Sequence, residues 1–116
     1  MAKYLIDTNI FLEILLEQEK KEKCKSFLVQ NYGEIVLSDF SLHSIGVILF
    51  RHQKYGLYNS FINDVLPNIQ VASIEKHRYS RLEEFAVRFN LDFDDAFQAV
   101  LAEELNLTIV TMDKDF

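Results

Sequence analysis

Residues 4–9 of this chain read YLIDTN, and residues 108–113 read TIVTMD. Each stretch begins with a short apolar run, typical of a buried strand, and an aspartate follows it: Asp7 in the first and Asp113 in the second. Ligands of open parallel sheets gather at the carboxyl ends of the strands. If the two runs are neighbouring strands, the sheet brings together carboxylates from opposite ends of the chain. Such a cluster suits a hard divalent cation and indicates a metal-dependent enzyme acting on phosphates.

Between these two runs, the spacing of apolar residues switches repeatedly between the periods of strands and helices. Strands are expected at residues 4–6, 34–37, 69–74 and 107–111. Helices are expected at about residues 18–31 and 75–90 and from residue 92 to about 105. Three more helices are expected around the apolar positions of residues 10–15, 42–49 and 61–66. The first of these helices is expected to have an N-cap at Asp7 or Thr8, and the helix after the second strand an N-cap at Ser38 or Asp39. A loop is expected at Gly56, and helices are expected to end at Pro67 and Asn90. Strands separated by helices predict one α/β domain over residues 1–116, with helices on both faces of a parallel sheet of about four strands.

Composition is that of a compact globular protein. The chain has 116 residues, of which 49% are apolar, and only three glycines and one proline. The formal charge of −6 argues against a broad basic surface for nucleic acid, although acids gathered in a cation site are compatible with a nuclease. The single cysteine, Cys24, is expected in the core. A lone cysteine, no N-terminal signal and short apolar runs predict a cytoplasmic protein without a membrane segment.

The order of elements and the positions of the acids resemble the PIN domain family over essentially the whole chain. The resemblance is carried by LIDTN at residues 5–9, by Asp94-Asp95-Ala96 at the opening of a late helix, and by TMDKDF at residues 111–116. It is closest to the small prokaryotic members that act as toxins in VapBC toxin–antitoxin pairs. The resemblance implies a three-layer α/β/α fold and an endoribonuclease that uses Mg²⁺ or Mn²⁺ to hydrolyse RNA.

Matched motif by motif, the resemblance makes Asp7, Asp95 and Asp113 the metal ligands and catalytic residues. It makes Asn9 and Thr111 the residues that orient these carboxylates or a bound water. Carboxylate oxygens suit Mg²⁺, and the metal would activate a water and offset charge on the phosphoryl oxygens. The resemblance also implies an RNA substrate, a homodimer, and a small antitoxin protein that covers the site.

Two features depart from the family's pattern. In the family, a Ser-x-x-Thr-x-x-Glu pattern opens the helix after the second strand, and its Glu is an acidic ligand. Here residues 38–44 read SDFSLHS, so Ser44 stands where the Glu is expected. Asp39 and His43 are close by, but neither has the expected spacing. The sequence also ends at Phe116, so the C-terminal edge element is expected to be shortened.

The loss of one carboxylate leaves two functions open. The chain is either an active ribonuclease, which can recruit Asp92 or Asp94 in place of the Glu, or a degenerate PIN domain. A degenerate domain would bind RNA or a protein partner without efficient cleavage. A structure-specific DNA nuclease of the 5′ type is a weaker alternative, because the longer chain and additional acids of those enzymes are missing from this sequence.

Each acid also has an ordinary structural explanation. Asp7 can cap the helix that follows it, and the helix dipole favours Asp92 and Asp94 in a first turn. Asp113 and Asp115 can be turn residues. The structural interpretation is favoured for Asp92, Asp94 and Asp115. The joint placement at one sheet edge favours a metal site for the other three acids: Asp7, Asp95 and Asp113.

Overall fold

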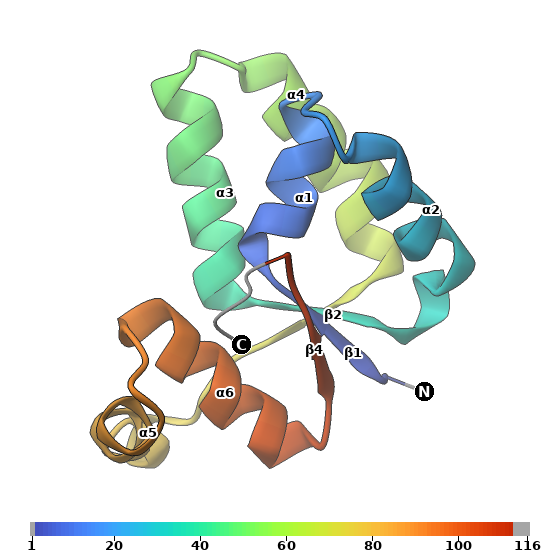
Figure 1. Cartoon of the computed structure of the whole chain (residues 1–116). Helices are drawn as coiled ribbons and strands as arrows, with labels where there is room; N and C mark the ends of the chain where they lie inside the picture. The colour runs from blue at the N-terminus through green and yellow to red at the C-terminus, as the bar shows by residue number, and fades with distance from the viewer. Residues whose placement is uncertain (1, 113–116) are drawn as a thin grey trace.

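The computed structural model describes residues 2–112, and within that range four strands form one parallel sheet (Figure 1). The sheet has the order β3-β2-β1-β4. Leu5 pairs with Val36 on one side and with Ile109 on the other, so the first and last strands are neighbours, as the sequence predicted. The strands are β1 (Tyr4–Ile6), β2 (Ile35–Ser38), β3 (Gln70–Ala72) and β4 (Thr108–Val110).

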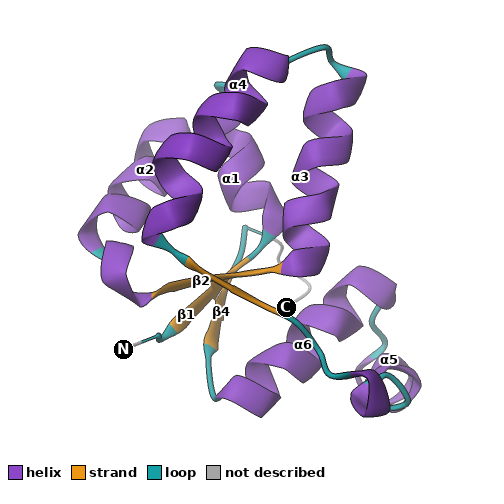
Figure 2. Cartoon of the chain, turned by 180° about the vertical axis from the view of Figure 1, so that it is seen from behind, coloured by secondary structure: helices purple, strands orange, loops and turns teal. Residues whose placement is uncertain are grey.

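Helices cover both faces of the sheet, which confirms the predicted three-layer α/β/α fold (Figure 2). One face carries α1 (Thr8–Leu15), α2 (Lys21–Gln30), α3 (Asp39–Arg51) and α4 (Tyr55–Ser60). The other face carries α5 (Arg81–Phe89) and α6 (Phe93–Leu105). Short helical turns connect these elements at Tyr32–Glu34, Phe61–Val65, Leu66–Asn68 and Lys76–Arg78. None of the helices in residues 2–112 is long and apolar enough to cross a membrane.

The sheet separates two hydrophobic clusters, because successive residues of a strand point to opposite faces. Leu5 and Val36 pack against α5 and α6, where Phe97 is almost fully buried. Ile6 and its neighbours in β2 pack against α1, α2 and α3. Cys24 is buried in this second cluster, as expected. The two clusters hold the N-terminal ends of α1, α3 and α6 at the same edge of the sheet.

Several predicted boundaries are wrong, including the helix end at Pro67, which lies inside the short helical turn Leu66–Asn68. Gly56 lies inside α4 instead of in a loop, because rings on either side of it pack against Phe50: Tyr55 at 5.0 Å and Tyr58 at 5.2 Å between ring centroids. The helix expected over residues 75–90 is a short turn followed by α5, since its apolar stripe begins only at Leu82. The third strand is shorter than residues 69–74. Asn90 ends α5 in a left-handed conformation, as predicted.

Candidate metal centre

A cavity of about 360 Å³ lies at the carboxyl end of β1, between the first turns of α1, α3 and α6. Its lining combines four aspartates with neutral polar and apolar side chains. The cavity is therefore at the sheet edge where the sequence predicts a site. Its lining residues are Asp7, Thr8, Asn9, Leu12, Phe40, Ser44, Ile48, Asp92, Asp94, Asp95 and Gln98.

The carboxylate of Asp7 is held by a contact from the last strand. Asp7 occupies the N-cap position of α1, but its side chain makes no capping hydrogen bond. Instead, the hydroxyl of Thr111 donates a hydrogen bond of 2.6 Å to Asp7 Oδ2, and the Asp7 backbone N–H donates to the Val110 carbonyl at 2.9 Å. Asp7 is therefore at the N-cap position that the sequence predicts, but its side chain does not cap the helix. Its carboxylate is tied to the strand end of β4.

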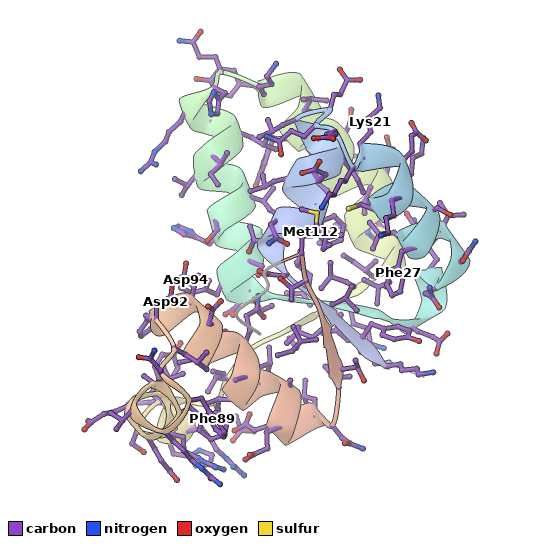
Figure 3. All side chains as sticks on the ribbon, in the orientation of Figure 1. Lys21, Phe27, Phe89, Asp92, Asp94 and Met112 are labelled. Atoms are coloured by element: carbon purple, nitrogen blue, oxygen red, sulfur yellow. The ribbon has the colours of Figure 1, made fainter. Side chains whose placement is uncertain are left out.

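Asp92 and Asp94 lie close together at the start of α6 (Figure 3), but the surroundings of their carboxylates differ. Asp92 caps the helix, because its Oδ1 accepts a hydrogen bond of 2.9 Å from the backbone N–H of Asp95. Burial raises the pKa of the Asp94 carboxyl above its ordinary value of 3.8, and the negative charges of Asp92 and Asp7 raise it further. The helix dipole alone would lower the pKa of Asp94. Burial and the two neighbouring charges act in the opposite direction and outweigh the dipole. Asp94 thus shares the electrostatic environment of Asp7, and Asp95 lines the same cavity.

A buried serine joins the three helices around the cavity. The hydroxyls of Thr8 in α1 and Ser41 in α3 are 2.8 Å apart, with Thr8 donating. The side-chain amide of Gln98 in α6 donates to the same Ser41 oxygen at 2.8 Å. Ser41 is fully buried, and its own backbone N–H donates to the Ser38 hydroxyl at 2.9 Å. Thr8 was expected to cap α1; it binds Ser41 instead, and this contact fixes how α1 and α3 meet.

The chemistry of the lining fits a hard cation. Two buried amide oxygens, Asn9 Oδ1 and Gln98 Oε1, have no hydrogen-bond partner within the described chain. Buried acceptors are normally paired, and amide and carboxylate oxygens are the ligands that Mg²⁺ and Mn²⁺ prefer. Residues 2–112 contain no group of three acidic, histidine or cysteine side chains that could hold a metal ion. Asp113, the third expected carboxylate, and Asp115 lie outside the described residues.

Comparison with known proteins identifies the family. The family model for the PIN domain matches residues 4–116. The chain belongs to the PIN domain family. This confirms the resemblance in the sequence, which covers the same elements. A comparison with curated protein sequences found no match to this PIN domain.

Solved structures show the same fold. The toxin VapC20 from Mycobacterium tuberculosis, which cleaves the sarcin–ricin loop, has a TM-score of 0.82 at 14% identity and covers 97% of this PIN domain and 92% of its own chain. A toxin–antitoxin complex from Klebsiella pneumoniae has a TM-score of 0.78 at 20% identity, and the match covers 100% of this PIN domain and 90% of the chain in that complex. PAE2754 from Pyrobaculum aerophilum has a TM-score of 0.73 at 17% identity, and the match covers 98% of this PIN domain and 82% of PAE2754.

This PIN domain has a serine at the cavity position where the family's glutamate was expected. Ser44 lines the cavity from α3, which places it beside the acids of α6. The nearby Asp39 and His43 do not line this cavity. Asp39 Oδ2 accepts a hydrogen bond of 2.8 Å from the Ser73 hydroxyl. Asp39 and His43 both line neighbouring hollows. Neither residue therefore takes the place of the glutamate.

Two residues of the site in this PIN domain were missed by the sequence analysis: Ser41 and Gln98. Both are polar residues at fully or almost fully buried helix positions. A signal for Gln98 was present, because it interrupts the apolar stripe of α6 three residues after Asp95 and four after Asp94. A signal for Ser41 was its position three residues after Ser38, because a capping side chain commonly bonds the backbone N–H of the residue three positions later.

Proposed function

We propose that this PIN domain is a metal-dependent endoribonuclease and the toxin of a toxin–antitoxin pair. The observation that carries the proposal is the shared cavity, where Asp7 from the end of β1 meets Asp94 and Asp95 from α6. The raised pKa of Asp94 supports it, since carboxylates gathered in a partly buried space favour binding of a proton or a cation. The fold shared with VapC20 and with a toxin–antitoxin complex supports the toxin role.

In this proposal, Asp7, Asp95 and Asp113 hold Mg²⁺ or Mn²⁺. When bound, the cation would activate a water molecule and offset the charge that develops on the scissile phosphate. The Thr111 hydroxyl keeps Asp7 Oδ2 in a fixed orientation. Asn9, in the first turn of α1, lines the same cavity and has an unpaired amide oxygen. Asp94 is the acid available to replace the missing glutamate, since Asp92 is already engaged as a helix cap.

The same proposal includes RNA as the substrate, a homodimer as the assembly, and a small antitoxin protein as the partner that covers the cavity. The net charge of −6 repels the RNA backbone, so a cation between the carboxylates and the phosphate would be needed for tight contact. This dependence on a cation distinguishes the proposed enzyme from nucleic-acid-binding proteins that rely on a basic surface.

Replacement of Asp7 tests the proposal. We expect wild-type protein to bind Mn²⁺ and to cleave RNA in its presence, and Asp7→Asn to lose both, because the amide removes the charge held by Thr111. Calorimetric titration with Mn²⁺ and a gel assay on structured RNA measure the two effects. Asp39→Asn is the matched control, since its carboxylate lies outside the cavity and bonds Ser73. Wild-type protein that neither binds Mn²⁺ nor cleaves RNA would overturn the proposal.

The second candidate function is a degenerate PIN domain that binds RNA or a protein partner without efficient cleavage. The specific observation in its favour is Ser44, which leaves the α3 side of the cavity without a carboxylate. Under this alternative, wild-type protein and Asp7→Asn bind RNA equally well and neither cleaves it. The same titration and gel assay therefore separate the two functions.

A further inference from the structure

The side chain of Gln98 is buried at the cavity with one half of its amide unused. Gln98 is 3% exposed, in the middle of α6. Its Nε2 donates a hydrogen bond of 2.8 Å to Ser41, whereas its Oε1 has no hydrogen-bond partner within residues 2–112. An unpaired buried acceptor is unfavourable, and an apolar residue at this position would avoid this cost. The unused oxygen therefore requires an explanation.

The position of Gln98 on α6 places it beside the acids. Residues three and four apart share one face of a helix, so Gln98 follows Asp95 and Asp94 along the same stripe. All three side chains line the cavity, and Asp7 lines it from the end of β1. The Ser41 oxygen that anchors the Gln98 amide also accepts from Thr8, so the amide is held between α1 and α3. The residue that carries this unpaired oxygen therefore lines the same cavity as the carboxylates.

We propose that Gln98 Oε1 is a ligand oxygen for the divalent cation of this PIN domain. The inference rests on the proposed metal-dependent function and adds a residue that no motif of the sequence assigns. A neutral amide oxygen is a hard donor suited to Mg²⁺ and Mn²⁺. It adds no negative charge to a cavity that four aspartates already line. Ser44 provides no carboxylate from the α3 side of the cavity. The amide oxygen of Gln98 would provide one ligand from the α6 side instead.

Methionine at position 98 tests this role, because it keeps the length of the side chain and removes the amide. We expect Gln98→Met to raise the Kd for Mn²⁺ about tenfold or more, the range seen when residues that support a metal ligand are lost. Titration of Mn²⁺ followed by electron paramagnetic resonance of the free ion gives the Kd without any RNA. Gln30→Met is the matched control, because Gln30 makes the same type of bond, to the Ser26 hydroxyl, on the exposed side of α2. The control should bind Mn²⁺ as wild type does.

The outcomes separate this inference from the function on which it rests. Loss of Mn²⁺ binding in wild-type protein, or binding that Asp7→Asn leaves intact, would overturn the proposed function. Asp7-dependent binding in wild type together with a Kd of Gln98→Met within about twofold of wild type would overturn the ligand role of Gln98 alone.

A second variant decides the matter if Gln98→Met fails to fold, as judged by circular dichroism. Gln98→Glu keeps the shape of the side chain and replaces the amide oxygen by a carboxylate. If Oε1 binds the cation, this variant should bind Mn²⁺ about tenfold more tightly and should gain thermal stability on adding Mn²⁺. An unchanged Kd in Gln98→Glu would show that position 98 does not contact the cation.

Discussion

Asp92 and Asp94 are two residues apart on one helix, yet they have different chemical roles. The Asp92 carboxylate accepts a backbone hydrogen bond and thereby stabilises the start of α6. Asp94 has no such bond among the described contacts, and burial raises its pKa. The two acids show that carboxylates close in sequence can have different surroundings, which set their hydrogen bonds and their pKa.

Asp94 should make the stability of the protein depend on pH. Its folded carboxyl binds a proton more tightly than the unfolded one, so its contribution is favourable below the ordinary pKa of 3.8 and is lost as pH rises through the raised folded value. We therefore expect Asp94→Asn to melt at a higher temperature than wild type at pH 7, with the difference narrowing toward pH 4. Thermal melts of both proteins without metal across this range provide the measurement. Parallel curves would show that the Asp94 pKa is not raised.

Replacement of Ser44 by glutamate should increase the proposed RNA cleavage activity. Ser44→Glu adds a carboxylate to the α3 side of the cavity, so we expect tighter Mn²⁺ binding and RNA cleavage raised about tenfold or more. Without metal, the added charge beside Asp94 and Asp95 should lower the melting temperature.

Ser44→Gln is the control, since it adds similar volume without charge. The same cleavage assay, run on Ser44→Glu and Ser44→Gln side by side, isolates the effect of the carboxylate. Equal rates for wild type and Ser44→Glu would mean that position 44 does not correspond to the family's glutamate in function.

At the scale of elements, α3 depends on a cap that is itself buried. The Ser38 hydroxyl accepts from the backbone N–H of Ser41, and both residues are fully buried. Ser41 in turn receives the contacts from α1 and α6. The start of α3 is therefore stabilised by its own capping bond and is also the place where α1, α3 and α6 are linked by hydrogen bonds.

Ser38→Ala should lower the free energy of unfolding by about 1–2 kcal/mol, the upper half of the range for lost caps, because it leaves a buried N–H unpaired. Urea denaturation of wild type and variant measures the loss. Ser80→Ala is the control, since Ser80 occupies the N-cap position of α5, is exposed, and makes no capping hydrogen bond. A loss as large in Ser80→Ala would contradict the importance of the Ser38 cap.

At the scale of the whole molecule, the sequence predicted the architecture well because the signals for it are local. Apolar runs indicated the strands, helical periods indicated the crossovers, and parallel strands with crossovers can form few arrangements. Gly56 was misplaced for the opposite reason: the contacts of Phe50 with Tyr55 and Tyr58 outweigh the low helix propensity of glycine.

The site was predicted less completely, because part of it depends on tertiary contacts. Asp7 and Asp95 were proposed from motifs, and both line the cavity. The hydrogen bond between Asp7 and Thr111, and the unpaired oxygen of Gln98, depend on how separate elements meet. The break that Gln98 makes in the apolar stripe of α6 marks this residue within its own helix, but it does not indicate that the amide will meet Ser41 in α3.

The pairing of the first strand with the last governs when the site can form. Asp7 and Thr111 are 104 positions apart, and their contact requires β4 to lie beside β1. Proteins are synthesised from the N-terminus, and long-range strand pairing is a slow step of folding. A nascent chain therefore lacks an ordered Asp7 until residues 108–111 have left the ribosome. The candidate site is thus completed only after the segment that supplies Thr111 has been synthesised and has paired with β1.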